Sequence, residues 1–175
     1  MKYIFYIFLL FSVFNVNLTH AQQLPKKGDN LPNPRLKRIA GTWVSIYGSD
    51  TLRIKLSFEN IKLPVLDLTA DVLVGYTYYK NGHSVIIDDI KYSYKTYDDS
   101  LNEGRKRASI FGLNELTGDI TGSIPDGQTS QSFKYKFIPS SDLNTMTATR
   151  QLRERFYINE KPGKGYPDEM IFKRE

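Results

Sequence analysis

The chain has 175 residues, contains no cysteine and carries a formal net charge of +5. This length permits one domain with a sizeable core, and the missing cysteines exclude disulfides, thiol nucleophiles and cysteine-bound zinc. Lysines and arginines mostly alternate with apolar residues and do not gather on one element, so the positive charge does not indicate a nucleic-acid-binding protein.

The first residues have the pattern of a secretory signal peptide. Lys2 supplies a positive charge, residues 3–14 are almost entirely apolar, and Thr19 and Ala21 are small residues at a cleavage position. An apolar run of this length is too short to cross a bilayer, which takes about 20 residues. We therefore expect residues 1–21 to be removed, leaving an exported protein without a membrane span, in the periplasm or the extracellular medium. An uncleaved anchor helix is the alternative.

Residues 22–33 contain prolines and a glycine among polar side chains, which is typical of a flexible leader. Asn33 followed by Pro34 indicates a helix start, because Asn caps helices and proline fits the first helical position. Gly41 would end that helix, so the sequence predicts one short helical turn over residues 34–40. The folded domain is expected to comprise residues 34–175.

Residues 42–60 carry the clearest strand pattern in the chain. From residue 51 onward, apolar and polar side chains alternate, which predicts a strand with one buried face and one wet face. The predicted buried positions are Leu52, Ile54, Leu56 and Phe58. Residues 42–47 are rich in aromatic and β-branched types, and Gly48-Ser49-Asp50 between the two segments favours a turn. The two segments are predicted to form a β-hairpin.

A third strand, residues 72–79, has apolar side chains on both faces. One face carries Val72, Val74, Tyr76 and Tyr78, and the other carries Leu73, Gly75, Thr77 and Tyr79. Such a strand lies either well inside a sheet or beside a lumen that could hold a ligand. Asn81-Gly82 is typical of a two-residue hairpin turn, so residues 84–91 would return antiparallel to this strand.

The second half repeats this alternation of short strands and turns. The adjacent acids Asp88-Asp89 and Asp98-Asp99 are interpreted as surface turns, because Asp favours turn positions. Alternation in residues 116–124 places Gly118 and Gly122 on the inward face, which indicates curvature or the close approach of another backbone or a ligand. A polar turn is predicted at residues 101–106, and further strands at 107–111, 133–137, 143–152 and 170–173.

Together these elements amount to about nine strands at regular spacing without a long helix. That pattern favours a single all-β domain, an antiparallel up-and-down barrel with one short N-terminal helical turn; a β-sandwich is the alternative. A barrel of about eight strands can be filled by side chains or can hold one small ligand.

The start of the domain, Gly41-Thr42-Trp43 after a short basic turn, resembles the start of a lipocalin-like barrel. The resemblance implies that Gly41 and Trp43 open the first strand, and that Trp43 packs across the closed end under an arginine from a late strand. Arg150 is the candidate arginine by its position in the chain. The Thr-Asp-Tyr motif of lipocalins is absent.

The chain is also similar to a family of small exported proteins of unknown function from Bacteroidetes. The residues that carry this resemblance are Gly41-Thr42-Trp43, Asp50-Thr51-Leu52, Asp71-Val72-Leu73-Val74-Gly75 and the terminal pattern from Pro167 to Lys173. The similarity runs from about Ile39 to the C-terminus. It implies no activity and no catalytic residues, so no functional site follows from it.

The favoured function is therefore a non-catalytic, monomeric binding module for a small, partly apolar ligand or a glycan. The predicted ligand-binding residues are the aromatic side chains Trp43, Tyr76, Tyr78 and Tyr135. Aromatic residues on strands also pack barrel interiors, and that reading remains open at this point. No cofactor, metal site or catalytic residue is predicted.

Two other functions are weighed against binding. After signal cleavage only His83 remains, which excludes a multi-histidine metal site, and no Gly-x-Ser-x-Gly motif is present. A glycan-directed hydrolase would need two acids with perturbed pKa in a cleft. A protein-interaction module could use an exposed strand edge or the arginines Arg150, Arg153 and Arg155.

Overall fold

The computed structural model describes residues 25–99, 102–114, 117–127, 132–151 and 166–175. The predicted signal peptide and the first part of the predicted leader lie outside the described residues, as do Arg153 and Arg155.

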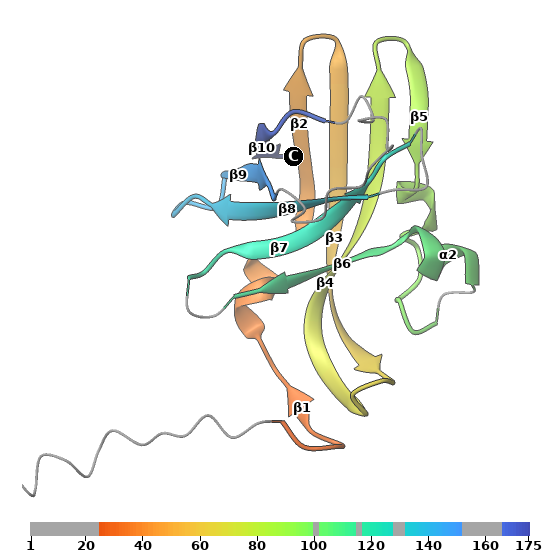
Figure 1. Ribbon diagram of the computed structural model, residues 1–175, viewed down its shortest axis with the longest axis vertical. Helices are drawn as coiled ribbons and strands as arrows, with labels where there is room; N and C mark the ends of the chain where they lie inside the picture. Colours follow the sequence, from red (N-terminus) through yellow and green to blue (C-terminus); the bar gives the residue numbers. More distant parts are fainter. Residues whose placement is uncertain (1–24, 100–101, 115–116, 128–131, 152–165) are drawn as a thin grey trace, which may run out of the picture.

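The described residues form ten β-strands, two 3-10 helices and one short α-helix (Figure 1). In chain order they are β1 (Asn30–Leu31), η1 (Pro34–Arg38), β2 (Gly41–Tyr47), β3 (Asp50–Leu63), β4 (Leu68–Asn81), β5 (Ser84–Asp88), η2 (Ile90–Tyr92), α2 (Asn102–Arg107), β6 (Ser109–Leu113), β7 (Ile120–Pro125), β8 (Ser132–Pro139), β9 (Thr145–Arg150) and β10 (Glu169–Arg174).

Eight of these strands close into an antiparallel barrel. Their order around the barrel is β2-β3-β4-β6-β7-β8-β9-β10, and β10 pairs with β2 to complete the circle. Each strand pairs with its neighbours in the barrel sequence, which is an up-and-down topology. The predicted all-β barrel is therefore confirmed, and the β-sandwich alternative is not adopted.

The predicted hairpin is confirmed in its register. β2 pairs with β3 from Gly41 opposite Leu56 to Tyr47 opposite Asp50, and β3 then pairs with β4 along its whole length. The alternation of β3 points Leu52 and Ile54 into the barrel, where they are fully buried. The alternation of apolar and polar residues in the sequence thus determines which side chains of β3 face the barrel interior.

β4 has two covered faces, which explains its continuous apolar character. Leu73 and Tyr79 point into the barrel and join the main core. Val72, Val74 and Tyr76 point outward and form a second core with residues of η2 and the segment around it, including Ile90, Tyr92 and Tyr97. The chain between β5 and β6 therefore folds back over the outside of β4, so no lumen is needed to explain its second apolar face.

Two irregular segments contain structure that the sequence did not predict. The predicted leader includes β1, whose Asn30–Leu31 pair with Thr69 and Ala70 of β4. The Asn30 side chain accepts hydrogen bonds from Asn60 and Thr69. These contacts with distant residues hold the segment in place, and the local sequence of a short polar segment does not predict them. The predicted polar turn at 101–106 contains α2, whose acid lies in its first turn and whose cations lie in its last, as the helix dipole favours.

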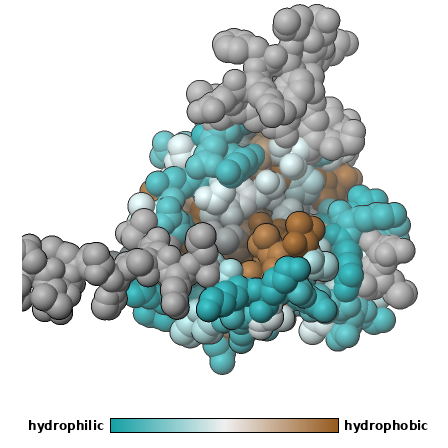
Figure 2. All heavy atoms as spheres, turned by 60° about the horizontal axis from the view of Figure 1, so that its bottom comes forward, coloured by the Kyte–Doolittle hydropathy of each residue, from teal (hydrophilic) through white to brown (hydrophobic). Residues whose placement is uncertain are grey.

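The short N-terminal helical turn is confirmed as η1, with Pro34 at its start. The lower end of the molecule in Figure 1 carries the turn between β3 and β4, whose Val65 and Leu66 are strongly exposed. Seen with this end turned forward, the coloured surface is mainly hydrophilic around a large apolar patch, with smaller apolar areas towards its edges (Figure 2).

Candidate binding site

Trp43 and the residues of η1 fill one end of the barrel, which we call the closed end. The Trp43 side chain is fully buried, and its Nε1 donates a hydrogen bond to the Ile39 carbonyl oxygen over 2.9 Å. Leu36 and Ile39 are buried in the same core. The 3-10 turn is therefore held to the barrel by an apolar contact and by the tryptophan's only donor group.

Arg174, on the last strand, occupies the position that the lipocalin resemblance assigns to an arginine. Its guanidinium carbon lies 5.1 Å from the centre of the Trp43 ring, and its Nη2 donates hydrogen bonds to the carbonyl oxygens of Arg38 and Ala40. Gly41 has a φ of +145°, which favours glycine, and a Cβ there would lie 3.3 Å from the Arg174 Nε. Gly41 and Trp43 thus hold the structural positions predicted for them.

The choice of Arg150 as partner of Trp43 was wrong. Register places Arg174 directly opposite Trp43, whereas Arg150 is opposite Tyr135 on β8. The Arg150 guanidinium lies 3.8 Å from the centre of the Phe133 ring and 3.5 Å from the Asp168 carboxylate. Position in the chain could not decide between two arginines on late strands, because the pairing of β10 with β2 was not known.

The barrel interior around Trp43 and Tyr135 is filled by large side chains. Phe111, Phe137 and Phe172 each have an exposed fraction of 1% or less. A Cβ on Gly75 or Gly122 would clash with the Phe111 ring, so these glycines make room for an aromatic side chain and not for a ligand. Gly118, predicted to face inward, is exposed in the turn before β7 with a φ of +71°.

The four predicted ligand-binding residues are not brought together. Trp43 and Tyr135 lie inside the barrel, but both are completely buried, and the Tyr135 hydroxyl donates to the Pro167 carbonyl oxygen over 2.9 Å. Tyr76 is buried in the second core outside the barrel, and Tyr78 lies beside the Arg53 guanidinium on the outer face. The sequence left open whether these aromatic rings bind a ligand or pack the protein. In the structure Trp43, Tyr76 and Tyr135 are packed in the two cores, and Tyr78 packs against Arg53.

The opposite end of the barrel contains a tyrosine cluster that the sequence did not single out. Tyr79 and Tyr166 meet edge to face with ring centres 4.9 Å apart, and the Tyr79 hydroxyl donates to the Asp50 carboxylate over 3.0 Å. The Tyr166 hydroxyl donates to the Pro125 carbonyl oxygen over 2.7 Å. Burial raises the pKa of Tyr47 and Tyr166, and raises the pKa of Tyr135 to about 12. These hydroxyls stay protonated at neutral pH.

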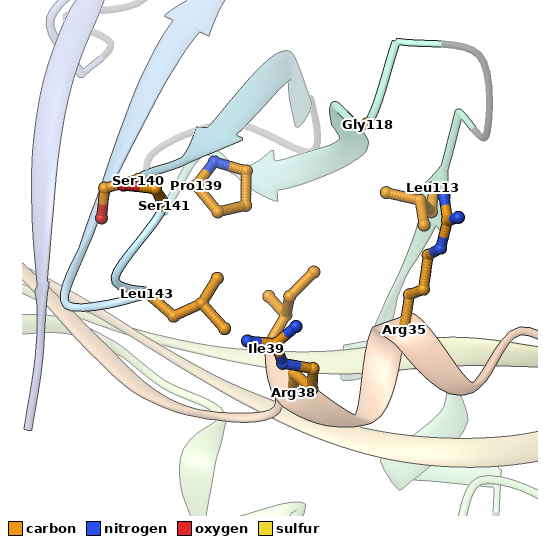
Figure 3. A pocket seen from close by; sticks show the side chains of 9 residues that line it. All are labelled: Arg35, Arg38, Ile39, Leu113, Gly118, Pro139, Ser140, Ser141 and Leu143. Atoms are coloured by element: carbon orange, nitrogen blue, oxygen red, sulfur yellow. The ribbon is translucent and has the colours of Figure 1, made fainter.

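A surface pocket of about 290 Å³ opens at the closed end, between η1 and the turns that follow β6 and β8 (Figure 3). Its lining residues are Arg35, Arg38, Ile39, Leu113, Gly118, Pro139, Ser140, Ser141 and Leu143. In Figure 3, Arg35 extends beside Leu113, and Arg38 and Ile39 rise from the same turn opposite Leu143. We call this cavity the closed-end pocket.

The turn between β8 and β9 presents Leu143 to this pocket at an energetic cost. Leu143 has a φ of +57°, a left-handed conformation that costs a non-glycine residue about 1–2 kcal/mol. The Ser140 and Asp142 side chains hold the turn, with the Ser140 Oγ 2.6 Å from the Asp142 carboxylate and the Asn144 amide donating to the same carboxylate. Such strain persists only where the surrounding structure enforces it.

The charge of the closed-end pocket comes from η1. Among the described residues, no carboxylate lies within ion-pair distance of the Arg35 or Arg38 guanidinium. Ile39, Leu113, Pro139 and Leu143 give the pocket apolar walls. The arrangement combines a cationic edge with an apolar interior, which suits a small molecule carrying an acidic group. The sequence showed the basic turn but not the two turns, after β6 and after β8, that lie beside it.

The described residues hold no cluster of three or more histidine and acidic side chains that could bind a metal ion. His83 is exposed in the turn between β4 and β5. Asp89, predicted to be a surface turn residue, is instead only 5% exposed. The helices of the described ranges are all too short to cross a lipid bilayer.

Comparison with known proteins identifies a family but no individual relative. No curated protein and no solved structure is significantly similar to the chain. The model of a family of unknown function, DUF6705, matches residues 1–139, which is well over half of the chain. The expectation of an uncharacterised family is thereby confirmed, and the chain belongs to the family of unknown function DUF6705.

Proposed function

We propose that the protein is an exported, non-catalytic binding module that holds a small, partly apolar anion in the closed-end pocket. The observation that carries this proposal is the pair of arginines, Arg35 and Arg38, set over apolar walls without an acidic partner among the described residues. A guanidinium binds a carboxylate or phosphate through two parallel hydrogen bonds, and apolar walls add affinity for the remainder of the ligand.

The size of the pocket fits this role. Small-molecule sites range from about 300 to 1,000 Å³, so a pocket of about 290 Å³ suits a ligand at the small end of that range. The interior around Trp43 and Phe111 is already filled, which favours a surface site over the lumen. Its serines, Ser140 and Ser141, have no histidine beside them in the described lining, which favours binding over acyl transfer.

Export is proposed from residues 1–21, whose charge and apolar run are those of a signal peptide. The mature protein would then act in the periplasm or the extracellular medium, as a monomer that exchanges its ligand with solution. A protein of this kind needs a site that is open to solvent, and the closed-end pocket lies at the surface.

The proposal is tested by titrating the mature protein with octanoate and with phenyl phosphate and measuring the heat of binding by calorimetry. Replacement of Arg35 or Arg38 by Gln removes a charged hydrogen-bond donor and is expected to weaken binding about tenfold. Lys37→Gln is the matched control, because Lys37 lies on the same helical turn and does not line the pocket. Equal losses in all three variants would show general charge attraction and would refute the site.

A second candidate, a protein-interaction module, is favoured by a row of exposed isoleucines on the outer face. Ile138 of β8 and Ile171 of β10 are both opposite Thr147 of β9, and Ile46 of β2 is also exposed. Native mass spectrometry of the protein from its host's exported fraction separates the two functions. A retained small molecule supports the binding module, and a co-purifying protein that is lost on Ile171→Lys supports the interaction module.

A further inference from the structure

A second cavity, of about 430 Å³, lies on the side of the barrel where η2 and α2 approach the turn after β7. We call it the side pocket. Three acids and three cations line it: Asp88, Asp89, Asp126, Lys91, Lys106 and Arg107. It shares no lining residue with the closed-end pocket, so it is an independent feature of the molecule.

Asp89 is the unusual residue of the side pocket. Its side chain is only 8% exposed, yet its carboxylate accepts no hydrogen bond from any residue that the structure describes. The nearest cationic atom, the Arg107 Nη1, is 3.9 Å away, which is beyond hydrogen-bonding distance. Burial accordingly raises the pKa of Asp89. The Asp89 oxygens are not among the described buried side-chain atoms without a partner, so they remain reachable from the pocket, where a ligand can supply hydrogen-bond donors.

The distribution of charge narrows the class of ligand. The buried acids Asp89 and Asp126 belong to the floor, whereas the cations Lys91, Lys106 and Arg107 are exposed at the rim. An anion would meet the buried carboxylates, and a cation would have to pass the three positive groups. The three acids and three cations balance, which favours a neutral ligand rich in both donors and acceptors.

The remaining lining supplies apolar surface beside these polar groups. Ile86, Ile87 and Tyr92 contribute to the wall. Gly127 brings the turn after β7 close to Ile86 and Ile87, because a Cβ at this position would lie 2.5 Å from the Ile86 Cγ2. A sugar ring presents hydroxyl groups along its edge and C–H groups on its faces, so it matches a pocket with both kinds of surface.

We propose that the side pocket binds a neutral sugar unit, whose hydroxyl groups donate hydrogen bonds to the Asp89 carboxylate and accept them from Arg107. The Asp89 Oδ1 and the Arg107 Nη1 are 3.9 Å apart, so no hydrogen bond between them has to break when a sugar enters. The volume accommodates a mono- or disaccharide within the range of known ligand sites.

The test is an NMR titration of the mature, isotope-labelled protein with methyl glucoside and with N-acetylglucosamine. Amide shifts that saturate and concentrate in residues 86–92, 106–107 and 125–127 support the proposal. Asp89→Asn is expected to weaken sugar binding about tenfold or more, since it removes a charged acceptor. Asp67→Asn is the matched control, because Asp67 is exposed and distant from the pocket, and Asn tolerates its positive φ.

Several outcomes would overturn the proposal. These are no saturable shift with either sugar, equal binding by the Asp89→Asn protein, or localised shifts with glycine or inorganic phosphate alone. Release of nitrophenol from aryl glycosides, lost in Asp89→Asn, would replace the binding site by a hydrolytic one. Failure of octanoate and phenyl phosphate to bind bears only on the closed-end pocket and leaves this test unaffected.

Thermal unfolding of the sugar-free protein distinguishes ligand binding from a structural role for Asp89. If the carboxylate is kept for a ligand, Asp89→Asn raises the melting temperature at neutral pH, because it removes a largely buried charge whose exposed partner, Arg107, lies 3.9 Å away without a hydrogen bond. A lower melting temperature would mean that Asp89 stabilises the fold through Arg107 and would contradict the proposal. Arg107→Gln, at an exposed position, gives a second variant that weakens sugar binding without disturbing the core.

Discussion

At the scale of single residues, Arg174 connects three parts of the molecule that are far apart in the chain. It contacts the Trp43 ring of β2, and its hydrogen bonds to Arg38 and Ala40 hold the end of η1 against the last strand. Both kinds of contact are made by the guanidinium plane, so a lysine at this position would not reproduce them.

Replacement of Arg174 by Gln is therefore expected to destabilise the protein by about 1–2 kcal/mol, from the lost cation–π contact and the lost hydrogen bonds at a partly exposed site. Urea unfolding monitored by Trp43 fluorescence measures this loss. Lys173→Gln, on the neighbouring exposed position of β10, is the control and is expected to change stability little. If Arg150→Gln destabilised the protein as much as Arg174→Gln, the assignment of the partner arginine would be wrong.

The sequence located these residues only in part. Gly41 and Trp43 could be predicted because Gly-Thr-Trp is a local pattern. The arginine above Trp43 could not, since it depends on a contact between the first and last strands of the barrel. Asp89 was missed for a related reason. Its turn position is a local property, whereas its burial results from α2 and the turn after β7, which lie far along the chain.

At the scale of elements, the packing of β4, β6 and β7 depends on two glycines that face one aromatic ring. Gly75 of β4 and Gly122 of β7 flank Phe111 of β6, which is 1% exposed. The register agrees, because β6 pairs with both β4 and β7. The short β6 is thereby anchored on both sides by its single large buried side chain.

Gly122→Ala is expected to destabilise the protein by about 1–3 kcal/mol, because the added methyl group overpacks the site against the Phe111 ring. Gly112→Ala is the matched control on β6, since a Cβ there meets no atom within 4 Å. The two changes are compared by urea unfolding. Combining Gly122→Ala with Phe111→Leu should recover part of the loss, and strictly additive effects would contradict the proposed contact.

The strands themselves were the most predictable elements, because apolar and polar residues alternate with a period of two in the sequences of β3, β7 and β8. The apolar character of β4 on both faces was visible too, but its cause was ambiguous. A lumen and an outer cover give the same pattern, and only the fold of residues 88–108 over Val74 and Tyr76 decides between them.

At the scale of the whole molecule, the barrel is closed by a short seam between β10 and β2. Two residue pairs join these strands, and the Arg53 guanidinium adds a bidentate contact to the Glu175 carboxylate across the seam. The two ends differ in character, since Trp43 and η1 fill the closed end, while the tyrosine cluster occupies the other end. Closure was predictable from strand number and spacing, but the seam was not, because its partners are separated by most of the domain.

Three buried tyrosines, Tyr47, Tyr135 and Tyr166, make the stability of the whole barrel sensitive to alkaline pH. Burial raises the pKa of Tyr135 from its usual 10.0 to about 12, and the pKa values of Tyr47 and Tyr166 are also raised. The unfolded chain then loses these protons before the folded protein does. The stabilisation from the protonated tyrosines is complete below pH 10 and falls as pH rises, by up to about 1.4 kcal/mol per pH unit for each group.

We expect the free energy of unfolding to decline steeply between about pH 10 and pH 12, as measured by urea titration at a series of pH values. Lysines titrate in the same range, so the comparison of variants is what isolates the tyrosines. Tyr135→Phe removes one of the buried groups and should make the decline shallower, whereas Tyr94→Phe, at a side chain that is 74% exposed, should leave it unchanged. An identical pH dependence for the two variants would show that the buried hydroxyl of Tyr135 does not govern the alkaline response.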